Sequence, residues 1–494
     1  MKLENITIRN YRSIEEIEVA IEEINGSYTY SLLGINESGK SSFLKAVSLY
    51  DNEDISYPLD YFDQSKPVEV VLTYTPDEDK IDEIKSTLRD DYNFDELVLS
   101  QIKINKVDII VQFSNDSSTI KTQLEDVTFE NSLFENYSMN GLLLVKDDES
   151  VTDSTEPLNL NTFFKNNLST TFWDSSHTVV FWKSSPEYLL LDEIDLNSFA
   201  SSPDKVSVPL FNCFRLAGIK SSNIESEIRK LNTPVAISSL QSKLSELTTK
   251  HINSVWPEHP ISVLFQINNN KISLLIEDND VKYKPKTTGQ RSDGFKQFIS
   301  FLLTVSVENY NDSLRNKILL IDEPETHLHP PAQINLLKEM IKITSNSNNN
   351  ILFFATHSNY LIDKFNLNRN FKLSKKKNLK TVINKIEQKI TTYSEVNYEV
   401  FDILTTDYHN ELFGFIESES PDKLDALDKK KTWINAKTQK TYNTSLSRYI
   451  RDSIHHPENQ LNKPFTEKEL KTSIEILRGL RDEIVKSNLA VVAN

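Results

Sequence analysis

The chain has 494 residues, about three times the length expected of one domain, so we expect two or three units. Hydrophobic residues make up 38% of it, which is enough for a core and excludes wholesale disorder. The 72 acidic residues outnumber the 55 basic ones, and the net charge of −17 excludes a chain that coats nucleic acid through bulk electrostatics. A local basic patch, and with it some contact with nucleic acid, stays open.

Cysteine use and the distribution of apolar residues predict the compartment. Cys213 is the single cysteine, so an internal disulfide and a thiolate zinc site are excluded and a reducing, cytoplasmic location is predicted. The first ten residues, MKLENITIRN, are charged and lack the apolar core of a secretion signal. Since no stretch approaches the ~18 consecutive apolar residues of a membrane span, we expect no membrane partner.

Residues 1–125 predict the first lobe of an α/β domain. An apolar strand at 28–33 runs directly into Gly34, and the apolar spacing at 40–50 predicts a helix. The order is therefore strand, glycine loop, helix. Alternating or apolar runs predict four more strands and a charged helix, at 6–8, 14–19, 68–74 and 107–113 for the strands and about 77–89 for the helix.

Residues 126–285 predict a helical insertion and a candidate dimerisation element. The first part is rich in Asn, Ser and Asp. Apolar residues at helical spacing follow at 224–252, interrupted near Pro234, and predict a helical arm too short for a long coiled coil. The apolar runs 261–267 and 272–276 flank three asparagines, which is typical of a hairpin.

Residues 286–375 predict a second lobe of the same domain. Two apolar strands separated by a helix indicate a parallel sheet. The remaining residues, 376–494, predict a helical C-terminal domain. The predicted fold class is therefore α/β, with a mixed sheet carrying a phosphate-binding loop, a helical insertion and a helical C-terminal domain. The expected elements of the second lobe are helices at 292–307 and 331–343 and strands at 318–321 and 351–355.

Residues 34–41, Gly-Ile-Asn-Glu-Ser-Gly-Lys-Ser, fit the pattern G-x-x-x-x-G-K-[ST] in the required context between a strand and a helix. In such a loop, backbone N–H groups curve around phosphate oxygens and the helix start adds the positive end of its dipole. We expect Lys40 to reach the β and γ phosphates and Ser41 to hold Mg²⁺. An ordinary glycine turn is the alternative. The residues assigned to nucleotide binding here are Gly34, Asn36, Gly39, Lys40, Ser41 and Ser42.

Polar residues with candidate catalytic roles follow the two strands of the second lobe. Burial makes carboxylates costly unless a cation compensates, so we expect Asp322 to bind Mg²⁺ through its water shell. Glu323 is placed to polarise the attacking water. His357 follows the other strand, and we expect it to contact the γ phosphate. A helix N-cap for the acids and a structural role for the histidine are the alternatives.

The order of these motifs resembles an ABC-type ATPase head of the RecF, SMC and OLD (overcoming lysogenization defect) group, of AAA15 or AAA21 type. The resemblance covers about 1–125 and 285–370. It rests on the glycine loop, on Ser-Asp-Gly-Phe-Lys-Gln from residue 292, on Leu-Ile-Asp-Glu-Pro from residue 320, and on His357. It implies ATP and Mg²⁺ as cofactors and ATP hydrolysis as the activity.

The same resemblance implies self-association. In such heads a signature segment, here Ser292 and Gly294, completes the ATP site of the opposite subunit, because a helix N-terminus caps the γ phosphate across the interface. The partner is then a second copy of the chain, in a head-to-head dimer or a higher homo-oligomer. Arg12 matches the basic residue that the family places near the nucleotide.

Comparison with the families of this group also indicates which partner protein the ATPase head works with. OLD nucleases carry a Toprim domain, whose metal site begins with a strand-end Glu-Gly followed by Asp-x-Asp, and no such pair follows His357. The outline resembles the ATPases of the Septu and PARIS phage-defence systems, which work with a separately encoded effector nuclease. This implies a sensor or scaffold ATPase of anti-phage defence with an effector nuclease encoded nearby. A RecF-like DNA-maintenance ATPase is one alternative.

A self-contained, ATP-gated ribonuclease is the other alternative. Arg451 and His456, on a predicted helix over 446–456, resemble the Arg-x4-His motif of HEPN ribonucleases, in which both residues act on a phosphodiester. The competing interpretation is a surface helix end, with histidines near the negative end of the helix dipole.

Two further patterns have competing interpretations. Glu325, His327 and His329 resemble a metal cluster by composition, but they directly follow the catalytic pair, where the family places a loop at the dimer contact, and we prefer that role. The basic runs 372–380 and 429–431 are typical of solvated faces, with a phosphate-backbone contact as the alternative.

Overall fold

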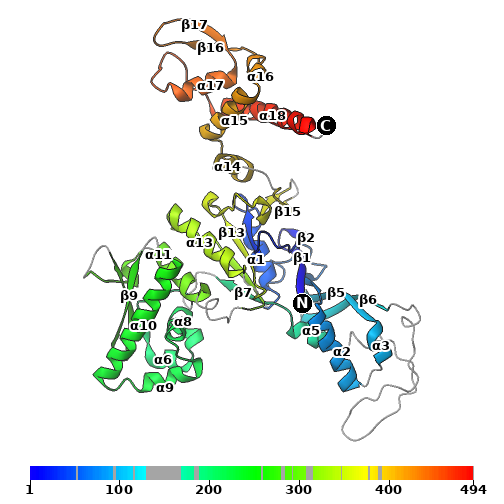
Figure 1. Ribbon diagram of the computed structural model, residues 1–494, viewed down its shortest axis with the longest axis vertical. Coiled ribbons are helices and arrows are strands. Elements are labelled where there is room, and N and C mark those ends of the chain that lie inside the picture. Colours follow the sequence, from blue (N-terminus) through cyan, green and yellow to red (C-terminus); the bar gives the residue numbers. More distant parts are fainter. Residues whose placement is uncertain are drawn as a thin grey trace. The chain divides into compact units, whose positions relative to one another are not determined.

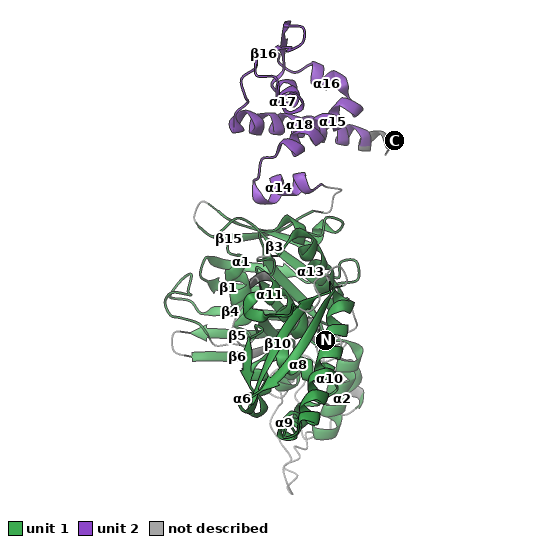
Figure 2. Cartoon of the chain, turned by 90° about the vertical axis from the view of Figure 1, so that its left-hand side faces the viewer, with its two compact units in different colours: residues 1–388 green, residues 389–494 purple. Residues whose placement is uncertain are grey.

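The chain divides into two compact units, residues 1–388 and 389–494 (Figure 2). Among the residues described, no helix is long and apolar enough to cross a membrane. Residues 130–167 of the predicted insertion lie outside the described residues. The computed structural model describes the chain except for residues 52–53, 93–95, 115–116, 130–167, 183–187, 257–259, 280–283, 292, 307–314, 327, 346–347, 377–378, 388–391 and 493–494.

A six-stranded sheet is the centre of the first unit, and its strands from β14 to β7 run parallel while β15 joins one edge antiparallel. Strand β12 is apolar throughout Ile318–Ile321 because both faces of the sheet are covered: alternate residues enter two different cores. The predicted α/β class with a mixed sheet is confirmed. The order is β15 (Thr381–Lys385), β14 (Asn370–Lys375), β3 (Thr29–Leu33), β13 (Ile351–Thr356), β12 (Lys317–Asp322), β7 (Thr178–Trp182).

The first core joins this central sheet to an antiparallel sheet and to helix α1 (Lys40–Ser48). Phe43, Leu44 and Val47 lie on the buried face of α1, as the helical spacing predicts. The antiparallel sheet has the order β2 (Ile14–Ala20), β1 (Lys2–Tyr11), β4 (Val68–Thr75), β5 (Ile102–Ser114), β6 (Ser117–Phe129), and three further helices belong to this part of the chain, α2 (Glu78–Tyr92), α3 (Glu96–Gln101) and α5 (Ser169–Asp174).

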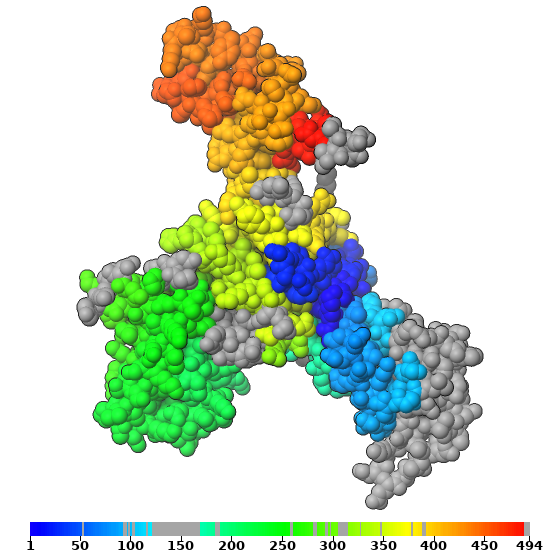
Figure 3. Space-filling view, in the orientation of Figure 1, coloured from blue at the N-terminus to red at the C-terminus, as the bar shows by residue number. Residues whose placement is uncertain are grey.

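The second core covers the other face of the central sheet and includes a small sheet around the predicted hairpin. Pro234 begins helix α10 (Pro234–Val255) behind the capping Thr233, since proline fits the first helical turn. Leu244 and Ile252 of this helix are buried in the core, so the predicted arm is a packed helix. Helix α10 lies along β9 (Ile261–Asn268), as Figure 1 shows. In the space-filling view the green residues of this region form one lobe (Figure 3). The remaining elements are β8 (Glu193–Asp195), β10 (Lys271–Asp278), β11 (Lys286–Thr287), α6 (Leu196–Ser201), α7 (Pro203–Val206), α8 (Val208–Leu216), α9 (Ile224–Arg229), α11 (Asp293–Phe301), a π-helical turn at Leu302–Ser306, and α13 (Pro330–Ile343).

Two strands lie outside the lobes that the sequence assigned to the ATPase domain. Strand β7 falls within the predicted insertion of 126–285, but it pairs with β12. Strand β15 falls within the predicted C-terminal domain of 376–494, but it pairs with β14 in the first unit. Local periodicity identifies a short strand without indicating its partner, because the pairing depends on residues far away in sequence.

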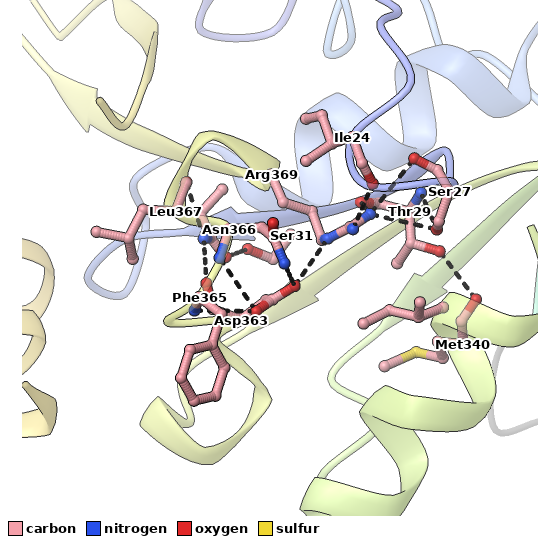
Figure 4. A network of polar contacts seen from close by, with 12 residues as sticks. Ile24, Ser27, Thr29, Ser31, Met340, Asp363, Phe365, Asn366, Leu367 and Arg369 are labelled. Atoms are coloured by element: carbon pink, nitrogen blue, oxygen red, sulfur yellow. Dashed lines mark hydrogen bonds and ion pairs between the residues drawn. The ribbon is translucent and has the colours of Figure 1, made fainter. Parts of the chain in front are cut away.

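A buried arginine fixes the segment that follows β13 to the start of β3 (Figure 4). Arg369 is 1% exposed and pairs with Asp363 at 3.1 Å. Its remaining donors reach the carbonyl oxygens of Ile24 at 2.7 Å and of Thr29 at 3.0 Å and the hydroxyl of Ser27 at 3.2 Å. The guanidinium thus satisfies backbone oxygens at the beginning of the strand that leads to the glycine loop.

The second unit is mainly helical and has a core of its own. Helices α15, α17 and α18 pack against one another, and Phe413, Ile450 and Leu477 are buried where they meet. A small antiparallel hairpin is the one departure from the predicted helical character that the described residues show here. The elements are α14 (Tyr393–Phe401), α15 (Thr406–Glu419), α16 (Pro421–Asp425), β16 (Lys431–Ile434), β17 (Thr441–Thr444), α17 (Leu446–His455) and α18 (Glu467–Val492).

Candidate nucleotide-binding site

The glycine loop between β3 and α1 has a backbone that only glycine fits. Gly34 and Gly39 have φ angles of +154° and +107°. A Cβ atom at Gly34 would lie 2.5 Å from the carbonyl oxygen of Leu373, and one at Gly39 would lie 2.6 Å from Oγ1 of Thr381. The two glycines therefore allow both the turn and a close approach of neighbouring strands.

Lys40 is buried at the start of α1, with its ammonium inside the loop. Its Nζ donates to the carbonyl oxygens of Gly34 at 2.9 Å and Ile35 at 3.1 Å. Burial lowers the pKa of Lys40, and the nearby carboxylates, Glu323 first, oppose that shift. An ammonium has three donors, so one remains for a ligand oxygen beside the loop.

Ser41 and Asp322 meet at the end of β12. The Ser41 hydroxyl donates to Oδ1 of Asp322 at 3.2 Å. Burial raises the pKa of Asp322, and the hydrogen bond from Ser41 opposes the shift. A hydroxyl and a carboxylate are hard oxygen donors of the kind that Mg²⁺ takes beside nucleotide phosphates, so this pair fits the expected metal.

Glu323 directly follows the last residue of β12 in a left-handed conformation with φ of 48°, which is uncommon for a residue with a side chain. Its N–H donates to the carbonyl oxygen of Ala355 at 3.0 Å, so the neighbouring strand holds the turn. The side chain is 52% exposed. The backbone of this acid is therefore held in an uncommon conformation while its carboxylate stays accessible.

His357 faces this carboxylate from the end of β13. Its Nε2 lies 3.5 Å from Oε1 of Glu323, and its backbone N–H donates to Glu325 at 2.8 Å. Burial lowers the pKa of His357 below its ordinary value, with the charge of Lys40 adding to the effect. The imidazole is therefore neutral at pH 7.

Most of these side chains line one cavity of about 510 Å³, and Asp322, which accepts the hydrogen bond of Ser41, is not among the lining residues. Seven of the predicted site residues line it: Asn36, Gly39, Lys40, Ser41, Ser42, Glu323 and His357. Four lining residues were missed by the sequence analysis: Ser13, Glu37, Ser38 and Lys375. Glu37 and Ser38 are variable positions of the loop motif, whereas Ser13 and Lys375 reach the cavity through strand pairings that local patterns do not reveal.

Two other residues predicted to bind nucleotide, Arg12 and Gly34, are not among the residues that line this cavity. Arg12 pairs instead with Asp60, at 2.6 Å. Gly294 belongs to the first turn of α11. Ser292 lies outside the described residues. Arg291, just before it, binds Asp278 of β10 through two contacts of 2.9 and 3.0 Å, which ties the signature segment to the small sheet.

The metal-cluster interpretation of the segment after Glu323 has no support in the described residues, which contain no group of three or more His, Cys, Asp or Glu side chains placed to hold a metal. His327 is not among them. Glu325 instead holds the backbone of His357, as described above. Its dimer-contact role remains a prediction.

The candidate ribonuclease pair has separate surroundings in the second unit. Arg451 lies over the ring of Phe413 at 5.2 Å and 3.4 Å from a carboxylate oxygen of Glu417. His456, the residue that ends α17, lies 3.3 Å from Glu458 and beside Trp433. Arg451 thus contacts residues of helix α15, whereas His456 contacts Trp433 of the β16–β17 hairpin.

A glycine loop between the parallel strand β3 and a helix, with an acidic pair at the end of β12, one strand beyond the neighbouring β13, defines a P-loop fold of the α/β class. The AAA ATPase domain family matches residues 1–362, and the chain belongs to this family. The predicted ATPase head is thereby confirmed. The match ends before the second unit.

Two relatives are similar to parts of the chain. The chain is 25% identical over 378 residues to Endonuclease GajA of Bacillus cereus (strain VD045), which covers 73% of this chain and 56% of the relative. It is 26% identical over 160 residues to Protein ea59 of Escherichia phage lambda, covering 31% of this chain and 28% of the relative. The chain thus spans about half the length of GajA.

Two solved structures overlap with most of the chain. The SMC head bound to the C-winged helix domain of ScpA has a TM-score of 0.41 at 12% identity, and covers 78% of this chain and 99% of that one. The SMC head domain from Thermotoga maritima has a TM-score of 0.37 at 10% identity, and covers 78% and 100%.

Proposed function

We propose that the chain binds ATP with Mg²⁺ in the P-loop cavity and hydrolyses it. The observation that carries this proposal is the single cavity lined by Lys40, Ser41, Glu323 and His357, which come from the ends of β3, β12 and β13. Parallel strands present their carboxyl ends at one edge of a sheet, where a ligand meets several loops at once.

The triphosphate is held by the P-loop. Backbone N–H groups of residues 34–41 and the N-terminus of α1 bind its oxygens, and the remaining donor of Lys40 adds a charge-assisted contact. Ser41 and Asp322 hold Mg²⁺, which neutralises charge on the phosphates when bound.

Glu323 accepts the proton of the attacking water, because its carboxylate is exposed to the cavity and its backbone is fixed by Ala355. His357 lies beside this carboxylate and donates its one N–H to the γ phosphate, a role for which a neutral ring is sufficient. Glu325 positions the histidine through its backbone N–H.

The test compares Glu323→Gln with Glu18→Gln, an exposed acid on β2. Glu323→Gln keeps shape and hydrogen bonding but removes the base, so we expect ATP turnover to fall at least about a hundredfold while ATP binding is retained. Glu18→Gln should leave both unchanged. Equal turnover in the two variants would contradict the proposal.

We infer that two heads associate when ATP is bound. The support is that helix α11 begins at Asp293, within the segment that resembles a signature acting on a second copy of the chain. The expected product is a head-to-head dimer or higher homo-oligomer. Mass measurement of Glu323→Gln with ATP, compared with Lys40→Ala with ATP, tests this: only the first should shift to the larger species.

We further propose that the protein is the cytoplasmic sensor or scaffold ATPase of an anti-phage defence system and controls a separate effector nuclease. The similarity to a protein named as an endonuclease, of which this chain spans about half, supports a link with nuclease function. The test is the mass of the purified chain with and without the neighbouring gene product, followed by nuclease assays on the complex. DNA-stimulated ATP turnover without such a partner would favour DNA maintenance instead.

A further inference from the structure

The described residues of the basic run, 372–376 and 379–380, form part of a β-hairpin beside the P-loop. Strands β14 and β15 pair antiparallel, with Lys375 opposite Thr381. The N–H of Lys376 donates to the carbonyl oxygen of Lys380 at 2.9 Å. We call residues 370–376 and 379–385 the basic hairpin.

Thr381 joins this hairpin to both the N-terminal sheet and the P-loop. Its N–H donates to the carbonyl oxygen of Ser13 at 2.8 Å, and its Oγ1 lies 2.8 Å from Oγ of the same serine. The hydroxyl also donates to the carbonyl oxygen of Ser38 at 3.3 Å. Since any Cβ at Gly39 would collide with Thr381, the hairpin and the loop are in direct contact.

The order of the central sheet places this hairpin opposite the hydrolytic residues. Strand β3, which leads to the P-loop, lies between β14 and β13. Glu323 and His357 come from the β13 and β12 side, whereas Lys375 comes from β14, and all three line the same cavity. A nucleotide with its γ phosphate at Glu323 therefore has its α phosphate and nucleoside on the side of the basic hairpin.

We propose that the basic hairpin is the nucleoside-side wall of the ATP site, in which Lys375 contacts the α phosphate or ribose and Thr381 positions the P-loop. This inference rests on the proposed function. Among the described residues of the hairpin, Lys375 is the lysine that lines the cavity. Lys380 has other contacts, with Glu15 and with the ring of Phe62, whose centre lies 5.4 Å from its Nζ.

A contact at the γ phosphate and a contact at the α phosphate or ribose have different effects on the binding of ATP and ADP. A residue at the γ phosphate favours ATP over ADP, whereas a residue at the α phosphate or ribose binds both equally. We therefore expect Lys375→Ala to weaken the binding of AMP-PNP and of ADP, each with Mg²⁺, by the same factor of about ten. The neighbouring Lys376→Ala removes the same charge from the turn and should leave both affinities unchanged.

Calorimetric titration of the full chain with AMP-PNP and with ADP measures these affinities. A loss confined to AMP-PNP would move Lys375 to the γ phosphate and overturn the proposal, as would equal affinities for Lys375→Ala and Lys376→Ala. Lys40→Ala gives the reference for a lost P-loop. If the wild-type chain bound neither nucleotide, the proposed function itself would fail, which is a different result from a binding-competent chain indifferent to Lys375.

Variants that remove or keep the hydroxyl of Thr381 test its positioning role. Thr381→Val keeps the β-branched shape and the backbone bond to Ser13 but loses the hydroxyl contacts with Ser13 and Ser38, whereas Thr381→Ser keeps the hydroxyl. We expect Thr381→Val to weaken both nucleotides severalfold and Thr381→Ser to restore binding, with unchanged thermal unfolding in both. Equal binding by the two variants would exclude the positioning role.

Discussion

The hydroxyl of Ser41 donates to the carboxylate of Asp322 at 3.2 Å, across a separation of 281 residues. This contact joins the two lobes of the ATPase domain at the point where Mg²⁺ is expected. It couples the first turn of α1 to the end of β12, so a ligand that binds both oxygens also fixes the position of the P-loop relative to Glu323.

The first prediction concerns the metal dependence of nucleotide binding. Ser41→Ala and Asp322→Asn each remove one oxygen ligand or its charge, so we expect Mg²⁺ to lose most of its effect on ATP affinity in both variants. Affinity is measured with Mg²⁺ and with a chelator. Ser48→Ala, at the other end of α1, is the control. An undiminished effect of Mg²⁺ in Asp322→Asn would exclude this residue as a ligand.

The parts of the site that the sequence predicts are those with a short-range signature. Residues 34–41 form a contiguous motif, and Asp322 and His357 each follow an apolar strand directly. Ser13, Lys375 and Thr381 come together only through the pairing of β14 with β3 and β15, which no local pattern indicates. For the same reason, a run of lysines looks like a solvated face until its strand partners are known.

The second prediction is the cost of removing Arg369. Arg369→Met leaves the carboxylate of Asp363 buried without its partner and removes donors from three backbone or hydroxyl oxygens, so the free energy of unfolding should fall by about 3–5 kcal/mol. Arg9→Met is the matched control: its side chain is 45% exposed, and its ion pairs should contribute less than about 1 kcal/mol. Urea unfolding measures the loss of stability in both variants. Equal losses would show that the buried contacts of Arg369 contribute no more than an exposed ion pair.

The third prediction is an acid sensitivity of the second unit. His409 is fully buried, with Nε2 2.9 Å from Oγ of Ser473, and burial lowers its pKa from 6.5 to about 4. In the unfolded chain the imidazole binds a proton below pH 6.5, so its contribution to stability is present above that pH and is lost as the pH falls toward 4. The loss between pH 7 and pH 4 is about 3 kcal/mol.

The comparison variant is His409→Gln, which retains a hydrogen-bonding group without titrating in this range. Urea unfolding at pH 7 and near pH 4 should show a smaller acid effect in the variant than in the wild-type chain. The other buried histidines are common to both proteins, so their contributions cancel. An identical pH dependence would show that His409 is not the sensitive group.

The last prediction separates the structural from the ribonuclease interpretation of Arg451. Its guanidinium lies over Phe413 and pairs with Glu417, within the contacts that join α15 to α17. We expect Arg451→Ala to reduce the stability of the second unit by about 1 kcal/mol, from the combined loss of a cation–π contact and a partly exposed ion pair. His456 is 58% exposed and ends its helix, so His456→Ala should not change stability. Thermal unfolding of the full chain and an RNA cleavage assay with ATP are measured together. Cleavage by the wild-type chain that both substitutions abolish, without any change in unfolding, would establish the ribonuclease instead.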